Sequence, residues 1–420
     1  MFLEFSLSLF IDAVGCHLTF VLFYTKVIFV IWGGLAKAMT VAVHHFDGLL
    51  TYFQGNPRLT RTQLEELSGL SRISVSQKIK SLINAQALVE VDFLPSIGGR
   101  KASLFSINPS IGYVGICYFS ATFLIVAVAD MTGAIVSSKS QDIDISDGPK
   151  ILLPIALDSL GELLKKIPKS KQLGIIVGVP GPVSHNSGKV VSAPIMKGWN
   201  GVDISSRFQD QLKLPTFLEN DVNLMVIAEH RLVYPDIDNL LLIKLGTGIG
   251  SGLIIHGELH RGSDGSAGDI GHNQFDALEG TICRCGRSGC LESFSSGWSL
   301  VERVQGLGYK VKKLSEIEKL ARNGNVEIII LLTRAAELIG HALADVVNLI
   351  NPSKIVIQGM IISESDQILA TIKEAIYQRG AALATSNLEI VRTKLGEDRG
   401  VLGAALLGLD KFFFSKLKTR

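Results

Sequence analysis

The sequence has no marked excess of charge of either sign. Its 420 residues include 41 Lys and Arg against 39 Asp and Glu, which gives a formal net charge of +2. This balance excludes a polybasic coat, so any contact with nucleic acid must come from a local patch. Charged residues are only 19% of the chain and hydrophobic residues are 47%, a composition that excludes global disorder. The 42 glycines and 12 prolines show no fixed period, which excludes a collagen-like chain.

Cysteine is also scarce. There are five cysteines, and Cys283, Cys285 and Cys290 fall within eight residues of one another. A secreted disulfide framework would spread an even number of cysteines along a short chain. The cluster therefore indicates metal binding in a reducing compartment.

Residues 1–44 form an apolar segment that is unlike the rest. Between residues 13 and 36 the only charge is Lys26, and the uncharged runs on its two sides are 13 and 10 residues long. Each run is shorter than the roughly 18–20 residues that span a bilayer, and a central Lys in one long span costs about 2.5–3.5 kcal/mol. A membrane tether, a signal peptide, an apolar helix packed on the body and a non-native extension all stay open. We favour the extension, with Met39 as the natural start.

The length predicts two or three domains, and residues 45–108 have the pattern of a helix-turn-helix. Thr60 and Gln63 have the spacing of a capping box at the start of a helix over residues 61–68. Gly69 makes the turn, and Ser71 caps a second helix through residue 84. The apolar positions expected to face the core of these helices are Leu64, Leu67, Val75, Ile79, Leu82 and Ile83.

A hairpin follows the two helices, and it has a basic tip. Strands over residues 87–93 and 102–107 flank the tip, so the hairpin is typical of a wing. Residues 56–110 contain seven Lys and Arg against four Asp and Glu. Small polar and basic side chains on an exposed helix suit base edges and phosphates, so we predict a winged helix-turn-helix that binds DNA. The residues predicted to contact DNA are Arg72, Ser74, Gln77, Lys78, Lys80, Arg100 and Lys101. An ordinary helical hairpin with a solvated face is the alternative.

Residues 109–420 alternate between apolar strands and helices, which predicts α/β layering. The strand over residues 240–245 leads into a glycine-rich turn over residues 246–252. Such a turn lets backbone N–H groups approach an anion or a sugar, although a tight turn between strands has the same pattern. Asn220 and Asp221 follow a short strand at 216–218, where they suit sugar hydroxyls or, alternatively, cap a helix.

The cysteine cluster has a histidine partner, His272. One imidazole and three thiolates at this spacing predict a tetrahedral zinc site formed by His272, Cys283, Cys285 and Cys290. Four protein ligands leave no open position, so the predicted Zn²⁺ is structural. Three buried free cysteines beside an unrelated histidine are the alternative.

These motifs together resemble the ROK family, which groups sugar-responsive repressors with sugar kinases. The matching stretches lie at residues 179–183, 197–201, 219–221, 245–250, 271–272 and 283–292. The resemblance implies a two-lobed, actin-like (hexokinase-like) fold with the sugar between the lobes. Lobe one would span about 109–220 plus the C-terminal helix, and lobe two about 221–390. The sugar contacts that the resemblance implies are Asn220, Asp221, Asp269, His272 and Glu292, with Asp269 at a position where the family usually has Glu.

One departure from the kinases decides the expected function. Family kinases have an acidic, glycine-rich phosphate loop after the first strand, whereas residues 117–121 here are Cys-Tyr-Phe-Ser-Ala. Cys117 replaces the carboxylate, and Phe119 is expected to obstruct phosphates. Phosphoryl transfer depends on positioning and charge stabilisation, so we predict that catalysis is absent or marginal, with Asp221 as a vestigial base.

The sequence therefore predicts a sugar-responsive transcriptional regulator of the repressor branch. We expect a cytoplasmic, nucleoid-associated homodimer or larger homo-oligomer that binds operator double-stranded DNA and a sugar or sugar derivative. A protein partner in place of the sugar and a membrane tether through residues 13–36 stay open. The alternative function is an ATP-dependent kinase of hexoses or N-acetylhexosamines.

Overall fold

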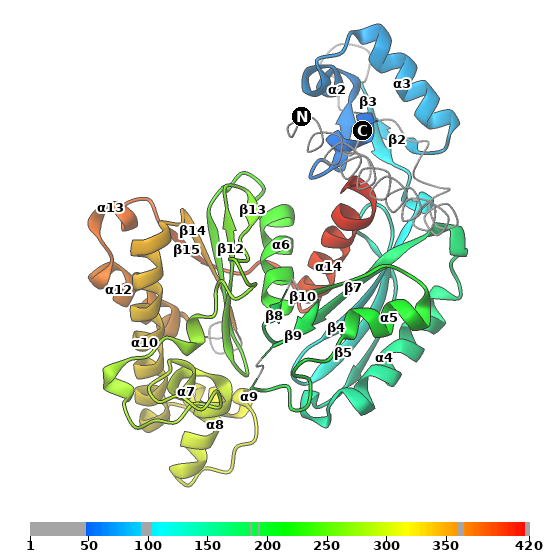
Figure 1. Cartoon of the computed structure of the whole chain (residues 1–420). Coiled ribbons are helices and arrows are strands. Elements are labelled where there is room, and N and C mark those ends of the chain that lie inside the picture. Colours follow the sequence, from blue (N-terminus) through cyan, green and yellow to red (C-terminus); the bar gives the residue numbers. More distant parts are fainter. Residues whose placement is uncertain (1–47, 94–101, 185–186, 192–193, 360–364, 416–420) are drawn as a thin grey trace, which may run out of the picture.

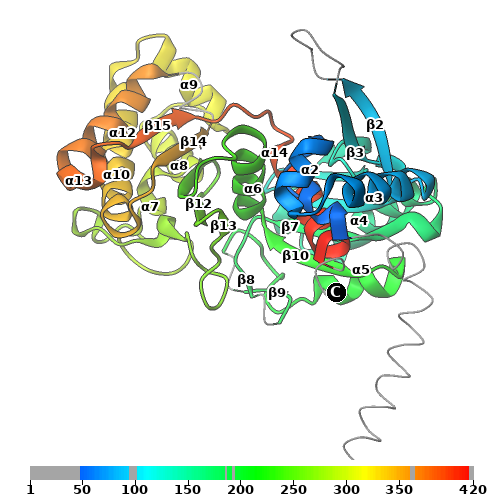
Figure 2. The ribbon, with the colours of Figure 1, turned by 90° about the horizontal axis from the view of Figure 1, so that it is seen from above.

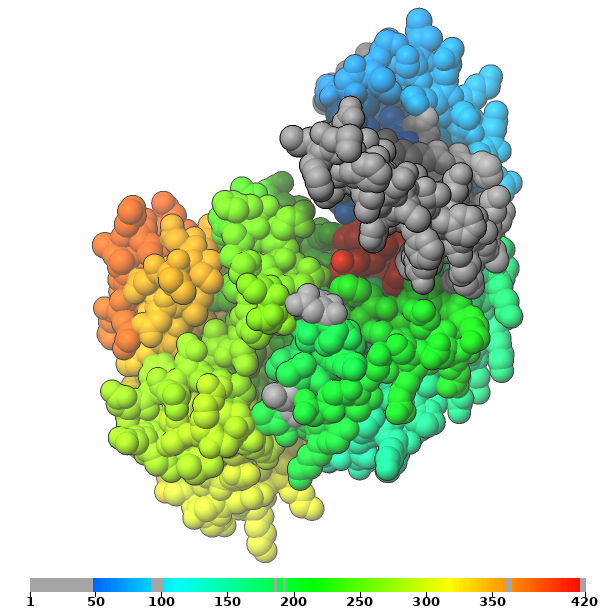
Figure 3. All heavy atoms as spheres, in the orientation of Figure 1, coloured from blue at the N-terminus to red at the C-terminus, as the bar shows by residue number. Residues whose placement is uncertain are grey.

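The computed structural model describes residues 48–93, 102–184, 187–191, 194–359 and 365–415. Within these ranges the strands form two five-stranded sheets, one three-stranded sheet and one two-stranded ribbon. The N-terminal unit lies at one end of the molecule, and the two large sheets belong to two lobes (Figure 1). Figure 3 shows the N-terminal unit projecting from the two-lobed body.

The N-terminal unit is a helix-turn-helix followed by a β-hairpin. Thr60 caps the first helix and forms the predicted capping box with Gln63, and Gly69 ends that helix in the left-handed region at φ 65°. Ser71 caps the second helix. Both predicted helices are confirmed. The elements are η1 (Gly48–Phe53), β1 (Leu59–Thr60), α2 (Arg61–Ser68), α3 (Arg72–Asn84), β2 (Leu88–Phe93) and β3 (Ser103–Ile107).

Fewer helical side chains are buried in the core of this unit than the sequence predicted. The buried side chains of the two helices are Leu64, Val75, Ile79 and Leu82. Leu67 is 48% exposed and Ile83 is 37% exposed, so their assignment to the core was wrong. Helical residues follow one another at about 100°, so Ile83 lies at the edge of the stripe that Leu82 occupies.

The hairpin strands β2 and β3 pair antiparallel, and β1 joins on the other side of β3. The tip at residues 94–101 lies outside the described residues. The predicted DNA contacts Arg100 and Lys101 therefore stay predictions.

Lobe one contains a five-stranded sheet in the order β10-β7-β4-β5-β6. Helix α4 packs on one face of the sheet and α14 on the other, as Figures 1 and 2 show. The apolar stretch 113–130 forms two strands of an antiparallel pair. The strands are β4 (Tyr113–Phe119), β5 (Phe123–Ala129), β6 (Ile135–Asp142), β7 (Gln172–Val179) and β10 (Thr216–Asn220), beside the ribbon β8 (Val183–Ser184) and β9 (Lys189–Val190). The helices are α4 (Pro149–Leu164), α5 (Ile204–Leu212) and the C-terminal α14 (Arg399–Leu409).

Lobe two contains the second sheet, in the order β13-β12-β11-β14-β15. Apolar side chains of β11 and β14 pack with α10 and α12 in one core. The strands are β11 (Leu240–Leu245), β12 (Ile249–Ile255), β13 (Glu258–Leu259), β14 (Lys354–Gly359) and β15 (Glu389–Arg392). The helices are α7 (Glu292–Ser295), α8 (Gly297–Gly306), α9 (Leu314–Arg322), α10 (Val326–Ile350), α12 (Asp366–Arg379) and α13 (Ala382–Thr385).

Helix α6 (Asp221–Val233) lies between the two lobes. It packs against α14 of lobe one and against β12 and β11 of lobe two. Its first ten residues are all buried, which is the pattern of a helix covered on every side. Gly403 of α14 permits this packing, because a Cβ there would lie 1.8 Å from the carbonyl oxygen of Leu224.

The side chain of Asp410, near the C-terminus, contacts both the N-terminal unit and the central helix α6. Asp410 belongs to the π-helical turn η7 (Asp410–Phe414) that follows α14. Its Oδ1 accepts a hydrogen bond of 2.7 Å from Gln54 Nε2 of η1. Its Oδ2 forms an ion pair of 2.5 Å with Arg231 of α6. One carboxylate therefore joins the N-terminal unit to the helix that begins at Asp221.

No helix in the described part of the chain is both long and apolar enough to cross a membrane. The proposed tether at residues 13–36 lies outside the described residues. Its status therefore stays a prediction.

Candidate functional site

Asn220 caps the central helix α6. Its Oδ1 accepts hydrogen bonds from the backbone N–H groups of Val222 and Asn223, at 2.9 and 3.2 Å. Its Nδ2 donates to the carbonyl oxygen of Gly181 at 3.0 Å. The capping role that the sequence left open is thus the one observed, and both ends of the amide have partners within the chain.

Asp221 is the first residue of α6, and its side chain is only 2% exposed. Lys244 of β11 donates to its Oδ2 at 2.5 Å. The buried Oδ2 is therefore compensated by the ammonium group of Lys244. Lys244 was not predicted, although it is the one charge in an otherwise apolar strand and so gives a visible signal.

Glu219 forms a second buried ion pair beside this one. Its carboxylate is fully buried, and Arg261 Nε donates to its Oε2 at 2.8 Å. Asn223 Nδ2 donates to its Oε1 at 2.9 Å. Both carboxylates that flank Asn220 are thus compensated by a cation from lobe two, as buried charges require. No sequence signal pointed to Arg261.

Glu292 lies at the end of the cysteine loop and is buried. Its Oε2 accepts a hydrogen bond of 2.8 Å from the N–H of Ile249, the first residue of β12. A Cβ on Gly248 would lie 2.7 Å from this oxygen, and one on Gly271 would lie 3.3 Å from it. The two glycines therefore let the carboxylate approach the β11–β12 turn.

The predicted sugar contacts gather around the end of the β11–β12 hairpin. Asp221 contacts this hairpin by its ion pair with Lys244 of β11, and Glu292 contacts it by its hydrogen bond with the N–H of Ile249 in β12. His272 follows Gly271, which is packed so closely that a Cβ would lie 2.4 Å from the carbonyl oxygen of Ile249. Asp269 begins the same short turn and is exposed.

The four predicted zinc ligands also converge. The ligand atoms of His272, Cys283, Cys285 and Cys290 lie within 4.8 Å of one another. Cys285 Sγ is 3.7 Å from Cys290 Sγ, and Cys283 Sγ is 3.7 Å from His272 Nδ1. A tetrahedral zinc ion with ordinary bond lengths needs edges of about 3.8 Å between sulfurs and about 3.6 Å between sulfur and nitrogen. The donor set and its spacing fit Zn²⁺.

The thiols of this cluster differ in acidity without a metal. Burial raises the pKa of Cys283 to about 12. Burial also opposes ionisation of Cys285, but hydrogen bonds with Arg287, Cys283 and Cys290 together outweigh it and lower the pKa of Cys285 to about 7. Zinc binds thiolates, so its binding at neutral pH would release protons from the cluster.

The altered phosphate loop lies at the end of β4. Cys117 and Phe119 are both fully buried. The Phe119 ring packs edge-to-face with Trp199, with 5.4 Å between centroids, in the core of lobe one. The expectation that this ring obstructs phosphates was wrong, because alternation along the strand turns it into the core. The loop still lacks the carboxylate and the glycines.

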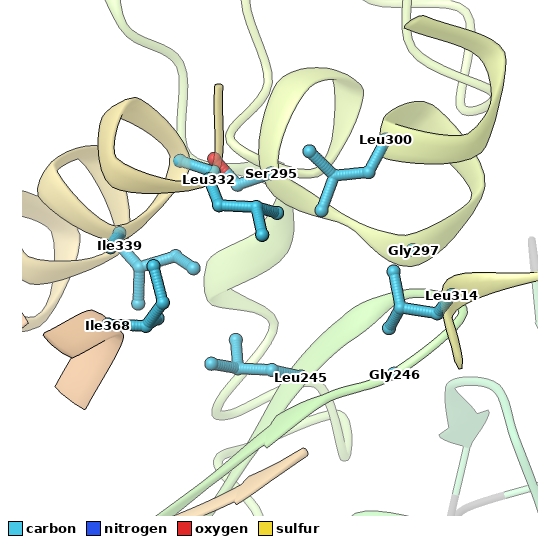
Figure 4. Close-up of a pocket in the computed structure, with 11 residues that line it drawn as sticks. Leu245, Gly246, Ser295, Gly297, Leu300, Leu314, Leu332, Ile339 and Ile368 are labelled. Carbon is cyan, nitrogen blue, oxygen red and sulfur yellow. The ribbon is translucent and has the colours of Figure 1, made fainter. Parts of the chain in front are cut away.

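A small pocket lies beside the end of β11 in lobe two (Figure 4). Its volume of about 20 Å³ holds about one water molecule. The lining is apolar except for Ser295, whose buried Oγ has no hydrogen-bond partner in the described part of the chain. None of the predicted sugar contacts lines this pocket, which is too small for a sugar ring.

The predicted DNA-binding residues of α3 divide into two groups. Arg72, Gln77 and Lys80 are exposed, whereas Ser74 and Lys78 are half-buried. Ser74 Oγ lies 3.0 Å from the Oγ of the cap residue Ser71. Helix α3 lies on the outer side of the N-terminal unit, away from the two lobes (Figure 1). The exposed face also carries Ile73, which was not among the predicted contacts.

Two helix-flanked sheets joined through α6 and α14 define a two-lobed α/β protein of actin-like fold. The chain belongs to the ROK family, because the sequence pattern of this family matches residues 120–411.

Both regulators and kinases are similar to this chain. The xylose repressor of Bacillus subtilis is 28% identical over 374 residues, which are 87% of this chain and 94% of the repressor. A glucokinase of Halalkalibacterium halodurans is 28% identical over 312 residues, 70% of this chain and 94% of the kinase. The crystal structure of a ROK family transcriptional regulator, described as a homologue of the Escherichia coli MLC protein, superposes with a TM-score of 0.73 at 23% identity. That match covers 89% of this chain and 97% of the regulator.

Proposed function

We propose that this protein is a sugar-responsive DNA-binding transcriptional regulator, and more specifically a repressor of genes for carbohydrate metabolism. The observation that carries the proposal is the combination of a winged helix-turn-helix with a ROK body whose catalytic parts are altered. Cys117 stands where family kinases have a metal-anchoring carboxylate, and Asp221 is held in an ion pair with Lys244. Such a body can still bind a sugar, but it is poorly equipped to transfer a phosphoryl group.

The extent of the similarity supports the regulator. The alignment with the xylose repressor includes 374 residues, whereas the alignment with the glucokinase includes 312. The longer alignment covers 87% of this chain against 70%. A regulator therefore accounts for more of this sequence than a kinase does.

In this proposal the effector binds between the lobes at the end of the β11–β12 hairpin. The proposed contacts are Asn220, Asp221, Asp269, His272 and Glu292. The ion pair with Lys244 uses Oδ2 of Asp221, so Oδ1 is the oxygen that we assign to a sugar hydroxyl. Zinc held by His272 and the three cysteines would fix the loop that carries Glu292, since structural zinc stabilises the fold around it.

The regulator would act as a homodimer or larger homo-oligomer on operator DNA in the cytoplasm. A sugar that binds one arrangement of the lobes better than another shifts the population toward it. A changed arrangement of two N-terminal units would alter the spacing of the half-sites that they match.

Two measurements test the proposal. A thermal-shift screen of monosaccharides, their phosphates and their N-acetyl forms is expected to find a ligand that raises the melting temperature. Selection from random double-stranded DNA is expected to yield an operator whose affinity changes when that ligand is added. Failure of both would overturn the proposal.

The second candidate is a ROK-type sugar kinase, favoured by the retained Asp221 and by the glucokinase alignment. It predicts ATP-dependent phosphorylation of hexoses or N-acetylhexosamines. Turnover near the usual enzyme median of about 10 per second would replace the regulator by this candidate.

A further inference from the structure

Ile73 is the second residue of α3, and its side chain is 72% exposed. It lies roughly opposite the buried Val75 and Ile79, so it adds nothing to the core of the unit. A β-branched residue at an exposed helical position is also less favourable for the helix than Ala. Its exposure leaves this side chain available for contact with a partner.

The surroundings of Ile73 favour a polyanion as the occupant of this face. Ile73, Gln77, Lys80 and Asn84 have the spacing i, i+4, i+7 and i+11, which places them along one side of a helix, and all four are exposed. The sequence of α3 contains three cations and no Asp or Glu. Charge therefore favours an anionic partner such as DNA over a basic or neutral one on this side of the helix.

The major groove has one apolar feature, the 5-methyl group of thymine. An apolar side chain near the start of an exposed recognition helix is placed to meet that group, because residues in the first turns of such helices reach base edges. We propose that Ile73 is a specificity-determining residue that contacts a thymine methyl in each operator half-site. This inference rests on the proposed DNA-binding function.

The test replaces the methyl group and the side chain separately. The full-length protein is first used to select an operator from random DNA. Each thymine of a half-site is then replaced in turn by uracil, which lacks only the 5-methyl group. Affinities are measured at one salt concentration for the wild type, Ile73→Ala and Ile83→Ala. Ile83→Ala is the matched control, because Ile83 is a partly exposed isoleucine of the same helix at its other end.

For the wild type, we expect one thymine per half-site at which uracil weakens binding about fourfold, the factor for burial of one methyl-sized group. Ile73→Ala should weaken binding to the thymine operator and lose this preference for thymine over uracil. Ile83→Ala should keep it. Circular dichroism and melting temperatures of both variants check that the helix is intact, as an exposed position predicts.

Three results would overturn the inference. They are equal binding of every uracil operator by the wild type, a preference for thymine that survives Ile73→Ala, and a loss of preference in Ile83→Ala as well. Each of these leaves operator binding, and with it the proposed function, in place. If no specific DNA can be selected at all, the proposed function fails first and the inference fails with it.

Discussion

The ion pair between Asp221 and Lys244 gives the sharpest test of how the centre of the molecule is held together. The perturbation is Lys244→Met, which keeps an unbranched side chain that is one atom shorter and removes its charge. The Asp221 side chain is 2% exposed and that of Lys244 is 19% exposed. Removing one partner of a buried pair costs about 3–5 kcal/mol, because the other charge stays buried without compensation.

The partial exposure of Lys244 points to the lower end of this range, about 3 kcal/mol. Unfolding entropy is about 2.1 cal/mol/K per residue, so for a body of roughly 310 residues each kcal/mol shifts the melting temperature by about 1.5 °C. Calorimetry of Lys244→Met should therefore show the body of the protein melting about 4–5 °C below the wild type. The double variant Asp221→Asn, Lys244→Met should recover part of the loss, because it removes the orphaned charge.

The matched control is Lys139→Met. Lys139 also pairs with a carboxylate, that of Glu162, but the two side chains are 50% and 60% exposed. Exposed pairs contribute about 0–1 kcal/mol, so this variant should melt close to the wild type. If Lys244→Met melts no lower than Lys139→Met, the central ion pair does not stabilise the interlobe region as we reason.

Three further predictions concern the metal, the interlobe packing and the link to the N-terminal unit. The wild type should contain one zinc per chain by elemental analysis, and Cys285→Ser should lose it and melt at a lower temperature; a stable, metal-free wild type would contradict the site. Gly403→Ala should destabilise by about 1–3 kcal/mol or more in urea unfolding, because the new Cβ would meet the Leu224 carbonyl at 1.8 Å. The control Gly306→Ala, with no atom within 4 Å of its Cβ, should be neutral or slightly stabilising. Asp410→Ala should cost about 1.5–3 kcal/mol, since it removes the acceptor of two charge-assisted hydrogen bonds; unchanged urea unfolding would show that water replaces them.

Local patterns in the sequence determined a large part of the architecture. The capping box at Thr60 and the cap at Ser71 fixed two helices, because these hydrogen bonds join residues only three positions apart. The sequence also predicted that Cys283, Cys285 and Cys290 bind one metal ion. Three cysteines within eight residues of a glycine-containing loop lie close together in most conformations of that loop. The alternation of strands and helices predicted the α/β class for the same local reason.

Where a pattern allowed two outcomes, the tertiary structure made the choice. The sequence could not show whether Asn220 caps a helix, and the arrival of α6 directly after β10 shows that it does. Phe119 was expected to obstruct phosphates, and only its contact with Trp199, which folding brings alongside, shows that it lies in the core instead.

Partners that lie far apart in the chain were decided by the fold alone. Lys244 reaches Asp221 because β11 places it beside the start of α6, and sequence spacing carries no information about that approach. Asp410 and Gln54 are 356 positions apart and meet only because the C-terminal turn returns to the N-terminal unit. Hydrogen bonds within a turn are specified by neighbouring residues, whereas ion pairs between elements depend on sheet order and helix packing, which the whole chain determines together.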